Sequence, residues 1–220
     1  MASSRPVSTA LYRTNGAYLP PAPATTTTTT LVPRAPGGWS LDSLSGRFLE
    51  ISSSGQSVSI TAAASLILES QLRGEPAAWV AVGESIFFPP DFDQCGIDLD
   101  SLPVVRVPRA LSASRVADRL LRSGSFGVIV LDLGTDIDMR IAVQVRLAAL
   151  AKKHRTTLVC LTQKEPAVPS LGPLVSLRAQ GAIHKTGFNR FTWELEILRD
   201  KRRGLEWRHT EVCRGPDGLC

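Results

Sequence analysis

A loop of small residues, Ser54-Gly55-Gln56-Ser57, lies between an apolar stretch at residues 47–51 and an apolar helical pattern. This is the setting of the phosphate-binding loop G-x-x-x-x-G-K-[ST], whose amides wrap phosphates while its lysine neutralises them and its hydroxyl holds Mg²⁺. Here Gln56 occupies the lysine position, and Glu50 occupies the position of the first glycine. The loop is also too short to encircle a phosphate. We therefore expect no ATP hydrolysis at this loop, which leaves weak nucleotide binding at the helix N-terminus or a purely structural loop.

A second candidate is Asp132, which follows four consecutive apolar residues at 128–131. An aspartate after a buried strand can hold Mg²⁺ in a nucleotide site. Many parallel strands end in aspartate, so Asp132 gains weight only because it follows the altered loop. The three histidines are not in a nucleophile motif, and no His/Cys/carboxylate cluster suggests a metal ligand set. We expect no catalytic residue, no metal and no cofactor.

The elements that must position these residues alternate between strand and helix patterns. An order of this kind predicts an α/β fold, a mostly parallel twisted sheet flanked by helices, with a C-terminal antiparallel hairpin. Ser112 or Ser114 is expected to cap the second long helix. The expected strands are 47–51, 77–82, 102–107, 126–131, 156–161, 174–179 and a hairpin of 192–198 with 205–211; the expected helices are 58–73, 112–123 and 138–154, with a helical turn at 91–96.

The ends of the 220-residue chain differ in composition from its centre. Residues 1–38 contain six consecutive threonines, six prolines and no apolar periodicity, which predicts a disordered tail or a peptide that docks on a partner. The folded core is expected over 39–212, and a flexible tail over 213–220. The sequence contains no apolar run of 18 residues and no secretory signal pattern, and its cysteines are widely spaced. These features favour a cytoplasmic protein without a membrane segment.

The net charge of +5 suggests nucleic acid, but residues 39–220 carry 22 basic and 20 acidic side chains. We therefore expect weak or no DNA binding. The remaining basic group near the C-terminus is either a solvated hairpin turn or a nucleic-acid contact in which Trp207 stacks on a base. Phe87 and Phe88 form either an exposed docking loop or a cover for the sheet edge. The candidate partner-interface residues are Phe87, Phe88, Arg199, Lys201, Arg202, Arg203 and Trp207.

Six segments in order resemble the RecA recombinase family over about residues 40–212. They are Gly46–Ile51 with its loop, Ala78–Glu84, Phe92–Asp100, Leu120–Asp132, Thr157–Gln163 and Ile197–Lys201. The resemblance implies a RecA-like fold, in which Glu84 falls on the catalytic glutamate and Gln163 on the nucleotide-sensing glutamine. It also places Arg199 and Lys201 on basic residues that reach across a filament interface. The degenerate nucleotide-site positions are then Ser54, Gly55, Gln56, Ser57, Glu84, Asp132 and Gln163.

Departures from that family determine the expected function. The phosphate loop is altered, the loops after Asp132 and after Gln163 are too short to grip DNA, and residues 1–38 cannot form the N-terminal helix that packs on a neighbouring protomer. A core of this kind resembles the ImuA family of accessory proteins, which implies a non-catalytic role in the SOS response and translesion synthesis. The implied partners are RecA, an inactive Y-family polymerase of the ImuB type and an error-prone C-family polymerase, with nucleoid association during DNA damage. The alternative is the SulA family, which inhibits cell division by binding FtsZ.

Overall fold

The computed structural model describes residues 38–54, 57–83, 85, 87–187, 190–204 and 207–214. The side chains of Ser57, Cys213 and Arg214 are not described. The chain divides into the units Met1–Pro33 and Arg34–Cys220, and every described residue belongs to the second. The tail expected over 1–38 therefore lies outside the described residues except for Gly38. Of the tail expected over 213–220, residues 213 and 214 belong to the last strand, and the rest is not described.

The second unit alternates strands and helices over its first two thirds and then continues as strands alone. The helices are α1 Leu41–Leu44, α2 Ser57–Leu72, α3 Pro89–Gln94, α4 Ala110–Ser123 and α5 Ile141–His154. The strands are β1 Phe48–Ser53, β2 Ala77–Val82, β3 Val104–Val107, β4 Val128–Gly134, β5 Thr157–Gln163, β6 Leu177–Gly187, β7 Arg190–Asp200 and β8 Arg208–Arg214. Each expected strand and long helix corresponds to one of these elements, with shifted ends.

All eight strands form one sheet in the order β3-β2-β4-β5-β1-β6-β7-β8. The first six strands in this order pair in parallel, whereas β7 is antiparallel to both β6 and β8. The expected mostly parallel sheet with a C-terminal antiparallel hairpin is confirmed. Because parallel strands share a direction, β1, β2, β4 and β5 all end at one edge, called here the carboxyl edge, and begin at the opposite, amino edge.

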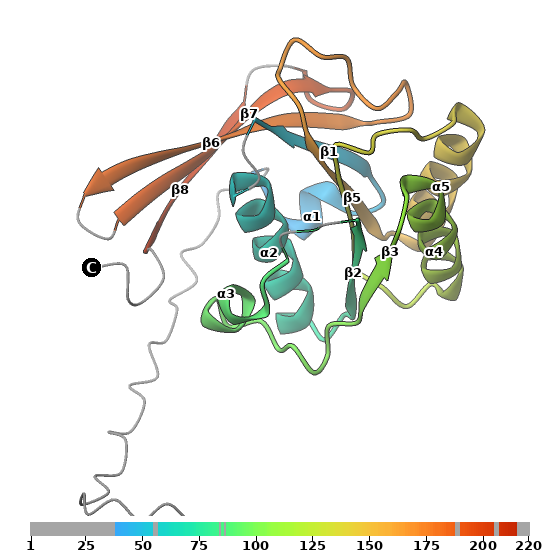
Figure 1. The fold of residues 1–220 in the computed structure, drawn as a ribbon, viewed down its shortest axis with the longest axis horizontal. Helices are drawn as coiled ribbons and strands as arrows, with labels where there is room; N and C mark the ends of the chain where they lie inside the picture. Colours follow the sequence, from blue (N-terminus) through green and yellow to red (C-terminus); the bar gives the residue numbers. More distant parts are fainter. Residues whose placement is uncertain are drawn as a thin grey trace, which may run out of the picture. The chain divides into compact units, whose positions relative to one another are not determined.

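Helices cover both faces of the sheet (Figure 1). On one face, α1 and α2 enclose a core that includes the fully buried side chains of Trp39, Trp79 and Trp193. On the other face, α4 and α5 pack over Phe48, Ile129 and their neighbours. The central strands are therefore buried on both sides, which explains their continuous apolar runs. No helix in the described part of the chain is long and apolar enough to cross a membrane.

Three local expectations are corrected by the structure. Neither Ser112 nor Ser114 caps α4: the cap residue is Arg109, without a side-chain hydrogen bond, and the Ser114 hydroxyl donates to the Ala110 carbonyl inside the helix. Strand β4 continues past Asp132 to Gly134, because the chain stays paired there with β5. Strand β6 is far longer than expected; its residues 182–187 are exposed, include the apolar Ile183, and belong to the part of β6 that pairs with β7.

Candidate functional site

The nucleotide-site positions are brought together at the carboxyl edge. Strand β5 lies between β4 and β1. Its last residue, Gln163, pairs with Ser53 of β1, and Leu161 pairs with Asp132 of β4. Ser54 follows β1 directly and is exposed. The sheet thus places Ser54, Gln163 and Asp132 at the ends of three adjacent strands.

Part of this predicted set is not described. Gly55, Gln56 and Glu84 lie outside the described residues, and Ser57 is described only as the first residue of α2. The bounds of β1 and α2 leave residues 54–56 as the whole connection between strand and helix. A connection of this length agrees with the expectation that the loop is too short to encircle a phosphate.

Asp132 faces inward rather than toward solvent. Only 4% of its surface is exposed, and the Ser85 hydroxyl donates a 2.5 Å hydrogen bond to its Oδ2 atom. Burial raises the pKa of Asp132 above its ordinary value, and hydrogen bonds from Ser85 and the Gly134 amide partly oppose that rise. Because Ser85 Oγ also accepts from the Phe87 amide at 3.1 Å, Asp132 fixes the segment that follows β2. Sequence reasoning missed Ser85, which has no motif of its own.

A buried ionic cluster, not anticipated from the sequence, surrounds Glu50 on β1. Lys164 Nζ lies 2.5 Å from Glu50 Oε1, and Arg178 Nε lies 4.0 Å from Oε2. Glu50 is fully buried and both cations are at least nine-tenths buried. Thr162 donates to Oε1, while the Ser170 hydroxyl and the Leu171 amide donate to Oε2 at 2.7 and 3.0 Å. Glu50 therefore attaches the loop after β5 to the sheet.

Two cations share this one carboxylate. Lys164 Nζ also donates to the Pro169 carbonyl at 2.7 Å. Arg178 Nε makes no hydrogen bond within the described residues, although its terminal nitrogen donates to the Glu165 carbonyl at 3.4 Å. Removing Glu50 would leave two buried positive charges without a counter-ion. One sequence feature could have predicted this cluster: Glu50 lies between apolar residues in a strand that is buried on both faces, so its charge needs a buried partner.

The basic interface candidates lie at the other end of the sheet. Because β7 is antiparallel to β6, its last residue Asp200 pairs with Leu177, at the amino edge. Arg199 and Lys201 flank Asp200, and Arg202 and Arg203 follow in the turn before β8. The structure therefore separates these residues from Asp132 and Gln163, which mark the carboxyl edge. Within one chain the two predicted groups do not form a single site.

A buried ion pair holds the turn after β7 in place. Arg47, which is 2% exposed, donates to both carboxylate oxygens of Asp200, at 2.6 and 3.4 Å. The Arg202 amide and Trp207 Nε1 donate to the same carboxylate at 2.8 and 3.2 Å. Burial alone would raise the pKa of Asp200, but the hydrogen bond from Arg47, together with the bonds from Arg202 and Trp207, lowers it below its ordinary value.

Two of the three aromatic interface candidates, Trp207 and Phe87, are packed against the protein and are not free to dock on a partner. Trp207 is partly buried against the core, its Nε1 is bonded to Asp200, and the Arg203 guanidinium lies 5.8 Å from its ring centroid. Phe87 is 7% exposed and packs on Trp79. Phe88 is 57% exposed. Phe87 therefore lies in the core, and only Phe88 retains the exposure that a docking loop requires.

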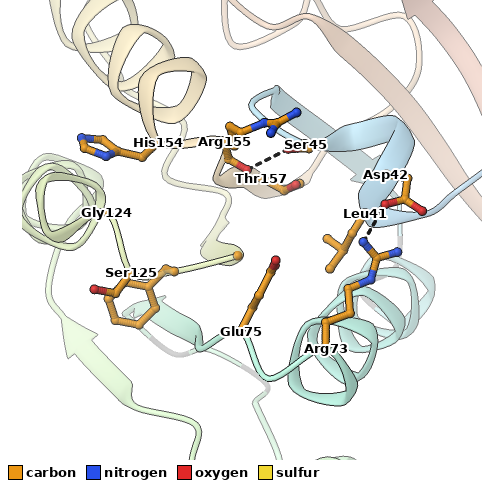
Figure 2. A pocket seen from close by; sticks show the side chains of 12 residues that line it. Leu41, Asp42, Ser45, Arg73, Glu75, Gly124, Ser125, His154, Arg155 and Thr157 are labelled. Atoms are coloured by element: carbon orange, nitrogen blue, oxygen red, sulfur yellow. Dashed lines mark hydrogen bonds and ion pairs between the residues drawn. The ribbon is translucent and has the colours of Figure 1, made fainter.

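A cavity of about 520 Å³ lies at the amino edge, far from the nucleotide-site positions (Figure 2). Its wall includes residues at the C-terminal ends of α2, α4 and α5. Arg73 points toward Asp42 in an ion pair of 2.7 Å, whereas Glu75 points into the space (Figure 2). The lining residues are Leu41, Asp42, Ser45, Arg73, Glu75, Gly124, Ser125, Phe126, Gly127, His154, Arg155 and Thr157. Sequence reasoning did not find this cavity, because helix ends from distant parts of the chain form it.

Comparison with known proteins gives no assignment. No protein-family model matches the chain, and no curated protein matches it significantly. Among the described residues, no group of three or more His, Cys, Asp or Glu side chains is arranged to hold a metal ion.

Proposed function

We propose that the protein is a non-catalytic accessory factor of the bacterial DNA-damage response, similar to the ImuA family, that acts by binding other proteins. The observation that carries the proposal is the state of the carboxyl edge. Three adjacent strands bring the altered loop, Gln163 and Asp132 together, yet Gln56 replaces the lysine in the sequence and Asp132 is buried against Ser85. The lysine that would neutralise phosphate is thus replaced in the sequence, and the aspartate that would help to hold Mg²⁺ is already bonded within the protein.

The proposed partners are RecA, through its N-terminal helix, and an inactive Y-family polymerase of the ImuB type that works with an error-prone C-family polymerase. A surface feature that favours a helical partner lies on α5. Ile141 and Val145, one helical turn apart, are 60% and 49% exposed, and Ile137 just before the helix is 36% exposed. Exposed apolar rows at helical spacing are surfaces on which a second amphipathic helix packs. Binding to RecA there would restrain filament formation and recombination.

A binding titration tests the proposal. The full chain is titrated with a peptide of the RecA N-terminal segment and, separately, with the inactive polymerase. We expect binding of at least one partner at micromolar concentration, and loss of RecA-peptide binding in the double variant Ile141→Asp/Val145→Asp. A matched control is Arg115→Glu, an exposed change on α4. Selective binding of FtsZ instead of either partner would support the SulA-like alternative and contradict this proposal.

ATP turnover distinguishes the proposed non-catalytic role from an enzymatic one. We expect no ATP turnover in the natural chain and none after Gln56→Lys, because the short loop and the buried Asp132 remain. Measured turnover that Asp132→Asn abolishes would show a working nucleotide site and overturn the non-catalytic assignment.

A further inference from the structure

Exposed basic side chains gather at the amino edge of the sheet from two distant parts of the chain. One set comes from the last turn of α5 and the residue after it, and the other from the turn between β7 and β8. All six side chains are exposed, and none forms an ion pair within the described residues. We call them the amino-edge basic cluster: Lys152, Lys153, Arg155, Lys201, Arg202 and Arg203.

The two sets are joined across the beginnings of neighbouring strands. The Leu158 amide donates to the Arg47 carbonyl, the Ser176 amide to the Phe48 carbonyl, and the Lys201 amide to the Ser176 carbonyl, at 2.8–2.9 Å. These bonds link β5 to β1, β1 to β6 and β6 to β7. The distance across the sheet from β5 to β7 is therefore three strand spacings, about 14 Å. Gly46, which precedes Arg47, lies close to the end of α5. A Cβ atom built on Gly46 would be 3.4 Å from Lys152 Cα and 3.6 Å from Arg155 Cα. The segments that carry the two sets therefore lie at the same edge of the sheet, about three strand spacings apart.

The acidic side chains described at this edge do not neutralise the cluster. Asp200 is buried and paired with Arg47. The others in ion pairs contact arginines outside the cluster: Asp42 and Glu69 bond Arg73, and Asp118 bonds Arg122 and Arg146. Glu75 lines the same cavity as Arg155, and no ion pair between them is found among the described residues. Glu206, in the turn, lies outside the described residues.

The turn is built to present its cations. The Arg47–Asp200 pair fixes its beginning, and Arg203 rests over the Trp207 ring. Desolvation and, to a lesser extent, the neighbouring Arg199 lower the pKa of Lys201, whose ammonium donates to the Pro173 carbonyl. The dipole of α5 accounts for cations at its C-terminal end, but no helix dipole accounts for the cations of the β7–β8 turn.

We propose that the amino-edge basic cluster binds the phosphate backbone of duplex nucleic acid without reading its sequence. Lysine and arginine side chains that neutralise phosphates supply such binding, and the arginine fork matches phosphate oxygens. Single-strand binding relies on aromatic side chains that stack on bases. Trp207, the aromatic residue of this turn, is partly buried and already bonded, so the duplex is the favoured form. This surface is separate from the protein-binding role proposed above and would add a contact with DNA.

The experiment measures fluorescence anisotropy of a labelled 20-base-pair duplex with the full chain across a salt series. Two charge-reversal variants test the two sets: Lys152→Glu/Lys153→Glu, and Arg202→Glu/Arg203→Glu. The matched control is Arg115→Glu/Arg140→Glu, which makes the same charge change at exposed positions outside the cluster. We expect each cluster variant to weaken duplex binding by about tenfold or more, and to lower the salt slope by about 0.9 for each phosphate that is no longer neutralised. The control should stay within about twofold of the natural chain.

Four results would overturn the proposal. One is equal weakening by the control and cluster variants, which would indicate a net-charge effect. Another is absence of duplex binding at low salt. Tighter binding to a 20-nucleotide single strand than to the duplex would reject the duplex assignment. Binding of a poly-glutamate peptide through the same residues, without duplex binding, would instead assign the surface to an acidic protein partner.

The α5 variant keeps the proposal testable even if the turn variant folds poorly. The side chains of Lys152 and Lys153 are exposed at the end of the helix and form no ion pair within the described part of the chain. Their reversal therefore changes the surface charge without removing a buried contact, and circular dichroism of this variant should match that of the natural chain.

Discussion

The carboxyl and amino edges of the sheet use charge in opposite ways. At the carboxyl edge two acidic groups face inward, while Asp138 and Glu165 are exposed: Asp132 is bonded to Ser85, and Glu50 anchors the loop that follows β5. At the amino edge the buried acid of the β7–β8 turn, Asp200, is matched by Arg47, while lysines and arginines face outward. The carboxyl edge thus keeps two carboxylates in internal bonds, and the amino edge exposes a group of cations.

This difference indicates where the protein meets its surroundings. A nucleotide site needs ionised oxygens and amides that face a ligand, whereas Asp132 and Glu50 at the carboxyl edge are used in internal bonds. The amino edge has its internal charge balanced, so its exposed cations remain available to partners. Contacts with other macromolecules are therefore expected at the amino edge and on the apolar row of α5, rather than around Asp132.

Breaking the Glu50 cluster should have the largest effect. Glu50→Gln removes the counter-ion of Lys164 and Arg178, both of which stay buried. We expect the free energy of unfolding to fall by about 3–5 kcal/mol, measured by urea denaturation. Glu196→Gln, at an exposed carboxylate 3.6 Å from Arg208, is the control and should change it by less than about 1 kcal/mol. Equal effects of the two variants would show that the buried cluster adds nothing specific.

Asp200→Asn should have the next largest effect. The variant leaves the Arg47 guanidinium buried without its carboxylate, although Arg47 keeps its hydrogen bonds to the Ser176 hydroxyl and carbonyl. We expect a loss of about 2–3 kcal/mol in the free energy of unfolding. Urea denaturation at pH 7 measures it, and an unchanged midpoint would contradict the anchoring role of this pair.

The pH dependence of that loss sharpens the comparison. The pKa of Asp200 is lower in the folded state than in the unfolded state. Its contribution to stability is therefore present above the unfolded value of about 3.9 and is lost as pH falls through the folded value. We expect the difference in the free energy of unfolding between the natural chain and Asp200→Asn to be largest at pH 7 and smaller at pH 3. A difference that stays constant over this range would reject ionisation of Asp200 as its cause.

Asp132→Asn, the same substitution at the carboxyl edge, should have the smallest effect. Burial raises the pKa of Asp132 in the folded state, so the ionised form opposes folding at neutral pH, and the amide oxygen can still accept from Ser85. We expect a change in the free energy of unfolding within about 1 kcal/mol, or a slight gain. A loss as large as that of Asp200→Asn would show that the two edges do not differ as described.

Strongly apolar segments were predicted well from the sequence. Strand β2 was expected at 77–82 and is found there, and the buried runs of β4 and β5 were placed within three residues at either end. Such strands are buried on both faces, so their residue types alone identify them. The distal half of β6 carries no such pattern: residues 182–187 are mostly exposed, and pairing with β7 alone makes them a strand.

The candidate site was predicted only in part, for a related reason. The alternation of elements predicted a mostly parallel sheet, but the strand order that makes the strands of Gln163 and Asp132 neighbours was found only in the structure. The partners of each charge depend on which side chains meet across the fold. Ser85 contacts Asp132, and Lys164 contacts Glu50, but no sequence spacing connects the members of either pair.

The central claim, that the protein works by binding a partner and without nucleotide, is tested most directly by one titration. The full chain is titrated with a peptide of the RecA N-terminal segment by calorimetry, with and without ATP and Mg²⁺. We expect micromolar binding with the same affinity in both conditions. Absence of binding at tens of micromolar, or binding that requires ATP, would contradict the claim.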